Sequence, residues 1–226
     1  MPELLRPIRH RSEQAQMDPM RIRVRAALGE RRTAPINTAR GLAKSVGERM
    51  AACGSGQGSV ERREDLPEPL QEVLRPLLEQ IESLSAQIEK CDDNIEQIAR
   101  QRYPETTLLR QVGGGGMWIA LTFVLTLEDR GHFQKSRDVG CYLGLRPKRS
   151  ESGQRQPELR ITKEGDPYLR KLLVQGAHHV LGWRGPDTDL RRWGQKLAAR
   201  GGNNAKKRAI VAVARKLGIL LHRLAA

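Results

Sequence analysis

Cysteine is scarce in this chain of 226 residues, and the three that occur are Cys53, Cys91 and Cys141. They are odd in number, lie far apart, and none belongs to a C-x-x-C pair. This spacing suggests neither a disulfide framework, which needs paired cysteines, nor a zinc site, which needs closely grouped ligands. Free cysteines fit a reducing compartment, so we expect a cytoplasmic protein.

Long apolar runs are also missing. No stretch reaches the length of about 18 apolar residues that a membrane-spanning helix needs. The N-terminus lacks the apolar core of a secretory signal peptide. We therefore expect a soluble protein with no membrane partner.

Acidic residues are few in the C-terminal part of the chain. From residue 130 onward there are 22 Lys and Arg against 7 Asp and Glu, whereas the first 129 residues hold 18 against 19. The whole of the net charge of +14 is therefore C-terminal. Such asymmetry predicts a neutral assembly region joined to a region that faces a polyanion, most simply nucleic acid.

Residues 1–62 are predicted to form a helical segment and a linker. Apolar residues follow helical spacing between Ile22 and Val46, with a break expected near Pro35. The Gly/Ser stretch at residues 52–59, ACGSGQGS, has no periodicity and predicts a flexible linker.

Residues 63–104 carry an apolar pattern with alternating spacings of 4 and 3. It comprises Leu70, Leu74, Leu77, Ile81, Leu84, Ile88, Cys91, Ile95 and Ile98. This is the seam of a coiled coil held over about four heptads. An amphipathic helix packed within its own chain is the simpler alternative. A paired helix could form a hairpin with the first helices or join two copies. Pro76 predicts a kink or a helix start.

Residues 105–226 are predicted to form a compact, basic, α-rich domain. Four glycines, Gly113, Gly114, Gly115 and Gly116, precede an apolar run that periodicity cannot assign to helix or strand. The glycines fit an ordinary loop, or a turn that brings backbone N–H groups to a DNA phosphate at a helix N-terminus. Residues 159–162 predict a short strand. Asp166 and Pro167 predict a helix start, with the helix ending near Gly182.

Two further apolar faces are predicted in this domain. The helix after Pro167 would bury Leu169, Leu172, Leu173, Ala177 and Val180. A last helix from about Asn203 would bury Ile210, Val213, Ala214, Leu217, Leu220, Leu221 and Leu224.

A serine-containing loop lies within the basic stretch LRPKRSESGQRQPELRITKEGDPYLRK, which has eight Lys or Arg among residues 145–171. Ser152-Gly153 between Arg149 and Arg155 combines a hydroxyl, backbone freedom and two guanidinium groups that suit phosphate oxygens. These groups could support attack on a phosphodiester if a base or a metal takes the hydroxyl proton. From the spacing alone, an ordinary loop serine is the simpler interpretation. The candidate phosphate contacts are Arg146, Lys148, Arg149, Arg155, Arg160, Lys163, Lys206, Lys207 and Arg208.

The segments GCYLGLRPKRSESGQRQPELRITKEGDPYLRKLLVQGAHHVLG and ARGGNNAKKRAIVAVARKL resemble the C-terminal domain of Piv/MooV-type insertion-sequence transposases. RRTAPINTARGLAKSVG, residues 31–47, resembles the helix that precedes the coiled coil in that family. Members pair a RuvC-like DEDD domain with a serine-bearing domain. In the C-terminal domain the resemblance extends from about Leu109 to the end of the chain. Together with residues 31–47 it covers most of the chain.

The resemblance implies roles that the composition does not show. Gly144-Leu145-Arg146-Pro147 precedes Ser152-Gly153 as in the family, so Ser152 would be the nucleophile that forms a phosphoserine link to DNA, with Ser150 as second choice. It also implies homo-oligomers held by the coiled coil, Mg²⁺ at the acidic site of the full-length enzyme, DNA ends and target as partners, and in several members a guide RNA.

Two departures from the family are expected to matter. Relatives carry a Pro-Gly-x-Gly turn similar to a helix-hairpin-helix, and Gly114 stands in place of the proline, which implies a looser turn. The chain also opens on helical sequence without the strand-borne acidic residues of a RuvC-like domain, and Asp18 is isolated. We therefore expect a truncated, catalytically incomplete transposase whose own residues bind no metal or cofactor. The alternative is a non-catalytic nucleic-acid-binding or regulatory protein that associates with full-length transposase.

Overall fold

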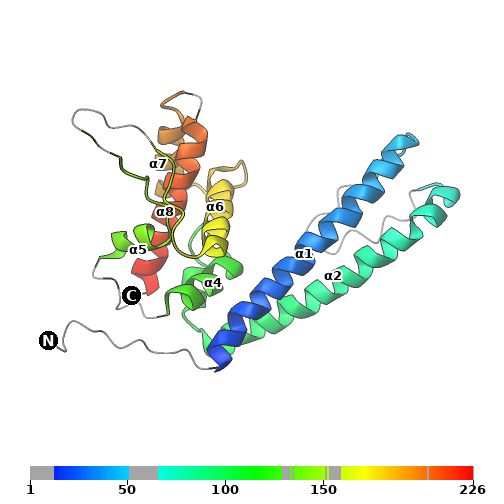
Figure 1. Cartoon of the computed structure of the whole chain (residues 1–226), viewed down its shortest axis with the longest axis horizontal. Coiled ribbons are helices and arrows are strands. Elements are labelled where there is room, and N and C mark those ends of the chain that lie inside the picture. Colours follow the sequence, from blue (N-terminus) through cyan, green and yellow to red (C-terminus); the bar gives the residue numbers. More distant parts are fainter. Residues whose placement is uncertain are drawn as a thin grey trace. The chain divides into compact units, whose positions relative to one another are not determined.

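The computed structural model describes residues 13–50, 66–128, 133, 135–150, 152, 159–202 and 204–225. These residues form eight helices and one isolated β-bridge, which confirms the mainly α prediction. The chain divides into two compact units, Met1–Gln97 and Ile98–Ala226 (Figure 1). The linker expected at residues 52–59 lies outside the described residues.

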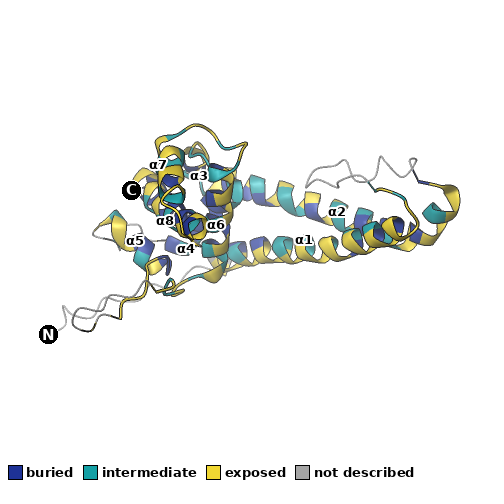
Figure 2. Ribbon diagram, turned by 90° about the horizontal axis from the view of Figure 1, so that it is seen from above, coloured by how far each residue is buried: buried dark blue, intermediate teal, exposed yellow. Residues whose placement is uncertain are grey.

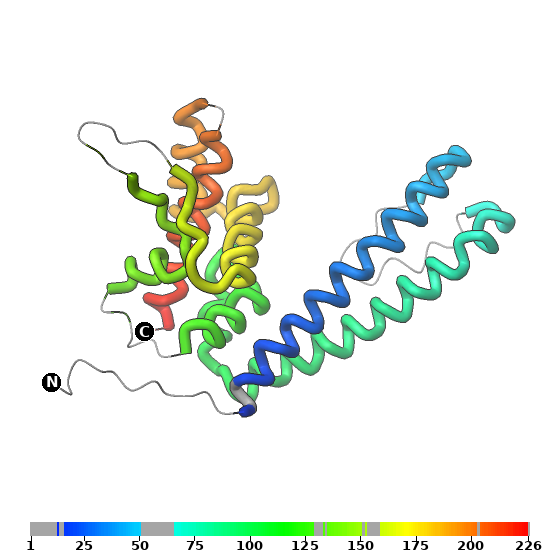
Figure 3. Tube along the Cα trace, viewed as in Figure 1, coloured from blue at the N-terminus to red at the C-terminus, as the bar shows by residue number. Residues whose placement is uncertain are grey.

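The first unit is an antiparallel helical hairpin built from α1 (Glu13–Ser45) and α2 (Glu68–Arg102), drawn in blue and cyan in Figure 3. The Arg25 guanidinium donates to both carboxylate oxygens of Asp92, at 2.6 and 2.9 Å. Arg32 Nη1 donates to Ser85 Oγ at 3.2 Å. A later residue of α1 therefore meets an earlier residue of α2, as antiparallel pairing requires.

The apolar seam of α2 is used inside the chain. Leu74, Leu78 and Ile81 are buried in one cluster with Ala39 and Ala43 of α1. Small residues on α1 let the two helices approach closely, while the larger side chains of α2 fill the interface. Of the two pairings left open by the sequence, the hairpin with the first helix is the one that the structure shows, and Figure 2 shows the buried stripe along it.

The break expected near Pro35 and the helix start expected near Pro76 are wrong. The helix α1 continues through Pro19 and Pro35, and α2 begins at Glu68, directly after Pro67 and well before Pro76. A proline inside a helix removes one hydrogen bond and costs about 3 kcal/mol. Packing outweighs that cost at Pro35, which is buried on the same face as Ala39.

The second unit packs short helices around a long C-terminal one. Its elements are α3 (Thr106–Leu109), α4 (Met117–Leu127), α5 (Ser136–Tyr142), α6 (Pro167–Leu181), α7 (Asp189–Ala198) and α8 (Ala205–Ala225). The helix α8 contacts α5, α6 and α7, and α4 packs on α6. The apolar run that periodicity could not assign is α4, which is buried on most of its surface because it lies in the middle of this core.

The prediction for α6 is confirmed. The Asp166 side chain accepts a hydrogen bond from Leu169 N at 2.6 Å, Pro167 is the first helical residue and Gly182 follows the last. All five predicted core residues of this helix are buried.

The predicted apolar face of α8 is partly wrong, because Leu220 and Leu224 are 37% and 38% exposed. The buried face instead includes Gly218 and His222. A Cβ on Gly218 would lie 3.1 Å from Leu143 Cδ1, so the absence of a side chain allows neighbouring leucines to approach. Close packing therefore selects the small residue and leaves two leucines at the margin.

Across the part of the chain that the structure describes, no helix combines the length and apolar character needed to cross a membrane.

Candidate nucleic-acid interface

A two-armed hairpin joins α5 to α6 and carries the predicted serine loop. Lys148 N donates to Arg160 O, and Thr162 N donates to Arg146 O, both at 2.9 Å, on either side of an antiparallel bridge between Pro147 and Ile161. The short strand expected at residues 159–162 is thus reduced to one bridge within the described residues.

The hairpin stem has an apolar face and a cationic face. Leu145 is buried and Ile161 packs against the core of the second unit. Because side chains alternate along extended arms, Arg146, Lys148 and Arg160 lie on the opposite face. All three are exposed. The stem therefore presents a row of cations away from the core.

Lys148 and Arg160 occupy directly opposite positions across the bridge, as their backbone hydrogen bond shows. Like charges in such pairs are destabilising, because opposite Cβ atoms lie only about 5 Å apart. The described residues of the hairpin, 145–150, 152 and 159–163, contain no Asp or Glu. An external anion would relieve the repulsion, which makes the stem a candidate phosphate-binding surface.

The remaining predicted residues of this loop are placed as follows. Ser150 and Ser152 are both exposed, as are Arg149 and Lys163. Arg149 has an interaction partner within the protein. Gly153 and Arg155, which were predicted to flank the serine, lie outside the described residues. The hairpin thus brings five predicted cations and both candidate serines onto one element.

The root of the hairpin is tightly constructed. Gly144 has φ +65°, and a Cβ there would overlap the backbone O and N of Glu164. Arg170 of α6 closes the root, because its Nη1 donates to the carbonyl oxygens of Leu143 and Glu164 at 3.1 and 2.7 Å. Part of the positive charge counted from the sequence therefore has a structural role.

The glycine turn between α3 and α4 is packed rather than open. Gly114 has φ +85°, and a Cβ on it would lie 2.8 Å from Gly176 O of α6. A Cβ on Gly113 would lie 2.8 Å from Pro186 Cγ, and one on Gly115 would lie 2.8 Å from Leu109 O. At Gly116 a Cβ would meet nothing within 4 Å, and this residue is exposed at the start of α4.

These contacts correct the expectation for Gly114. A proline ring fixes φ near −65°, so a proline could not occupy Gly114 at its observed φ of +85°. The turn is also tight rather than loose, because three of its glycines lie against other atoms. Close packing accounts for these three, and only Gly116 retains the open approach that the phosphate-turn prediction requires.

The predicted cations of the last helix cluster in its first turn. Lys206, Lys207 and Arg208 are exposed, and no acidic residue lies in that turn. A helix N-terminus carries partial positive charge and is normally stabilised by Asp or Glu. Cations there raise the local positive potential instead, which suits contact with an anion. These residues and the hairpin stem belong to different elements.

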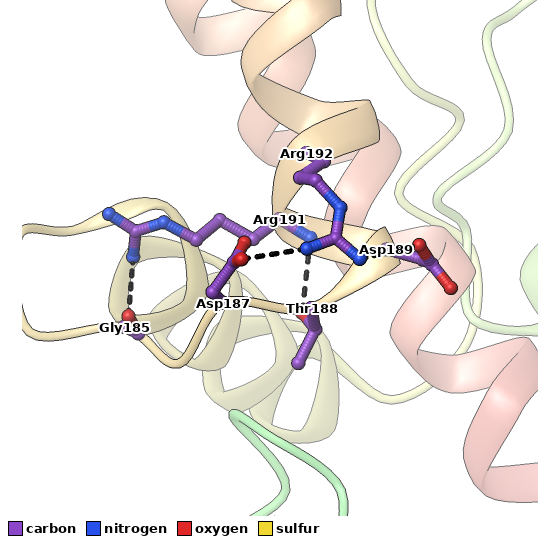
Figure 4. A network of polar contacts seen from close by, with 6 residues as sticks. All are labelled: Gly185, Asp187, Thr188, Asp189, Arg191 and Arg192. Atoms are coloured by element: carbon purple, nitrogen blue, oxygen red, sulfur yellow. Dashed lines mark hydrogen bonds and ion pairs between the residues drawn. The ribbon is translucent and has the colours of Figure 1, made fainter.

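The turn between α6 and α7 contains contacts that the sequence did not indicate (Figure 4). Arg191 Nη1 donates to the carbonyl oxygens of Val180, Gly182 and Gly185 at 3.0, 2.6 and 2.8 Å. These carbonyls belong to the C-terminal end of α6 and the following turn, and the guanidinium satisfies them as a cation at a helix C-terminus should. Like Arg170, Arg191 uses its guanidinium to stabilise the fold.

Arg192 extends the same network on the surface. It binds Asp189 and Asp187 at 2.8 and 2.7 Å. The hydrogen bond to Asp189, together with the charge of Asp187, raises the pKa of Arg192. The pairs are exposed, so their main effect is to offset part of the negative charge of the two carboxylates rather than to stabilise the fold.

Among the described residues, no group of three or more His, Cys, Asp and Glu side chains could hold a metal ion. Asp18 is buried beside Arg21, whose Nε lies 3.7 Å from its Oδ1. The Mg²⁺ expected of a full-length family enzyme therefore has no ligand set in this part of the chain.

Comparison with known families finds a match within this domain. Residues 106–191, which span α3 to the start of α7, match the family described as "Transposase IS116/IS110/IS902 family". This segment is therefore similar to transposases of the IS116/IS110/IS902 family. The matched transposase segment contains the glycine turn, the cationic hairpin and the turn held by Arg191, whereas the first turn of α8 lies beyond it.

Named relatives agree with this assignment. The chain is 28% identical to "Transposase for insertion sequence element IS1111A" of Coxiella burnetii over 207 residues, 86% of this chain and 54% of that protein. It is 31% identical to "Probable family 20 transposase" of Pseudomonas aeruginosa over 188 residues, 79% of this chain and 55% of that protein. The chain thus spans about half the length of these curated relatives.

Proposed function

We propose that this chain is the DNA-binding portion of an insertion-sequence transposase and that its cationic hairpin contacts the DNA backbone. The observation that carries the proposal is the outward face of the hairpin stem. There Arg146, Lys148 and Arg160 lie exposed, with no Asp or Glu among the described residues of the hairpin, and Ser152 of the same hairpin is also exposed. Matches to transposases support DNA as the anion that binds here, because the substrate of such enzymes is DNA.

The proposal predicts strongly salt-dependent binding of duplex DNA. A phosphate contact releases condensed counterions, so the logarithm of the binding constant should fall with the logarithm of salt concentration by about 0.9 per contact. With three stem cations and the first turn of α8 engaged, we expect a slope of about −3 to −5. Fluorescence anisotropy of a labelled duplex at 50 to 300 mM KCl measures it. A slope near zero would refute backbone contact.

Within this proposal Ser152 is the nucleophile of DNA cleavage. Its Oγ would form a bond to phosphorus while the bond from phosphorus to a deoxyribose oxygen breaks. The hydroxyl proton would pass to a base and the departing oxygen would gain a proton. The exposure of Ser152 at residue level permits this approach. The described residues supply no carboxylate cluster that could hold the activating metal, so the step requires acidic residues from elsewhere.

We expect a covalent DNA adduct that depends on Ser152. The chain is incubated with Mg²⁺, DNA carrying insertion-sequence ends, and a separate RuvC-like domain of a relative, and the products are separated under denaturing conditions. Ser152→Ala should abolish the adduct, whereas Ser150→Ala should retain it. Equal adduct from Ser152→Ala would reject the nucleophile. DNA binding with no adduct under any condition would favour the non-catalytic, regulatory alternative.

Self-association is a further part of the proposal. The seam of α2 is occupied by α1, so a second copy would need another surface. The outer side of α1 offers Met17, Met20 and Val24, which are 47%, 58% and 56% exposed and lie at helical spacing. A second copy covering this stripe would bury it. A monomeric mass in sedimentation equilibrium at micromolar concentration would contradict this part.

A further inference from the structure

We propose that Trp183 is a stacking platform for an unpaired base of a single-stranded nucleic acid. The proposal rests on the function proposed above, because it assigns a second contact to the same class of partner. Trp183 is 83% exposed, the most exposed large apolar side chain among the described residues. Single exposed apolar residues are common on protein surfaces. Three features of its surroundings set this one apart.

The first feature is the rigidity of the backbone that presents it. Gly185 N donates to Gly182 O at 3.1 Å, which closes a tight turn with Trp183 and Arg184 at its two corners. Arg191 Nη1 binds the carbonyls of both glycines, at 2.6 and 2.8 Å. Side chains at turn corners project away from the protein. An indole held on such a turn loses little conformational entropy when it binds a flat partner.

The second feature is the arrangement around the ring. The guanidinium carbon of Arg184 lies 4.3 Å from the centroid of the Trp183 ring, over one of its faces. Since the residue remains 83% exposed, the other face of the indole is open to solvent. A nucleobase stacked on that face would complete an Arg–Trp–base sandwich, with the Arg184 charge near the flanking phosphates.

The third feature is local charge. Asp187 and Asp189 lie just beyond the turn and would repel a phosphate backbone. Arg192 pairs with both, at 2.7 and 2.8 Å, and offsets one of the two negative charges. Arg184 and Arg191 of the same turn outweigh the remaining negative charge. Gly113 lies against Pro186, so the Trp183 turn adjoins the glycine turn, in which Gly116 alone retains an open approach.

An unpaired base fits this site better than a duplex. Bases inside a duplex expose only their edges, whereas stacking requires a free face. The chemistry is the same for DNA and RNA, because every nucleobase has a π face. The experiment therefore has to determine whether the bound strand is DNA or RNA.

The test measures binding of the whole chain to four fluorescent ligands at fixed salt. They are a single-stranded DNA, the RNA of the same sequence, an abasic strand of equal length and a duplex. Trp183→Ala should weaken binding to at least one of the two base-containing strands about 5- to 100-fold, as expected for the loss of one stacked base. Trp183→Phe keeps an aromatic face and should retain most of the affinity. Trp183→Leu keeps apolar bulk without the ring and should behave like Trp183→Ala.

The abasic strand and the duplex separate this inference from the proposed function. Both should bind wild-type and Trp183→Ala protein equally, because they offer phosphates but no free base. If the duplex binds with the predicted salt dependence while Trp183→Ala leaves both base-containing strands unaffected, the stacking inference fails and the proposed function stands. If neither the duplex nor any strand binds wild-type protein, both fail. A larger loss for the DNA or the RNA strand identifies the sugar.

Discussion

Replacing Arg146, Lys148 and Arg160 together by Gln should reduce the slope of the salt dependence of duplex binding by about 2.7. Each cation on the outer face of the hairpin stem is taken to neutralise one phosphate. If wild-type and variant affinities converge at 1 M salt, the variant should bind about 500-fold more weakly at 0.1 M. Anisotropy titrations of the same duplex at several KCl concentrations measure both quantities.

A matched variant separates the hairpin from overall charge. Arg31, Arg49 and Arg75 are exposed arginines of the first unit, and their replacement by Gln removes the same charge elsewhere. This control should leave the slope within about 0.5 of the wild-type value, since charges outside the contacted surface are largely screened at salt concentrations of about 0.1 M and above. Equal losses in the two triple variants would show that net charge, rather than the hairpin, determines binding. Unchanged circular dichroism would confirm that both variants are folded.

The stem variant should not destabilise the protein. Lys148 and Arg160 face each other across the bridge, and their mutual repulsion disappears with the charges. Binding and stability should therefore change independently, or in opposite directions. This behaviour is expected of residues held in place for a ligand, because their repulsion is relieved only by the partner.

Local features of the structure could be predicted from the sequence because their causes are local. Asp166 and Pro167 define the start of α6 through one side-chain hydrogen bond and one fixed φ, both within four residues. The spacing of apolar residues along α2 predicted its buried seam for the same reason. Such features need no knowledge of distant segments.

Other features depend on residues far apart in sequence and could not be predicted. The glycine turn is tight because Gly114 lies against Gly176, about sixty residues later. Arg170 and Arg191 look like surface cations in the sequence, yet both donate to backbone carbonyls. Composition gives the number of charged residues, but it cannot show which of them stabilise the fold and which are available to bind a ligand. The cations of the hairpin stem could be distinguished from such structural arginines only once their cross-strand positions were known.

A close backbone approach lies at the root of the hairpin, where Gly144 meets Glu164. Gly144→Ala should destabilise the protein by about 3 kcal/mol, which combines the cost of a positive φ in a residue with a Cβ and the overlap with Glu164. For a chain of this size the melting temperature should fall by about 6–12 °C. Thermal unfolding followed by circular dichroism at 222 nm measures the change.

Gly201→Ala is the matched control, because Gly201 has φ +80° but a Cβ there would meet nothing within 4 Å. Gly201→Ala should lower the free energy of unfolding only by the cost of a positive φ in alanine, about 1–2 kcal/mol. The same loss in both variants would mean that the approach to Glu164 carries no penalty. Gly144→Ala should also weaken duplex binding at temperatures where the protein is still folded, since a displaced root moves Arg146, two residues away. Gly201→Ala should not move the stem, so comparison of the two variants links the geometry of the root to the position of the cations.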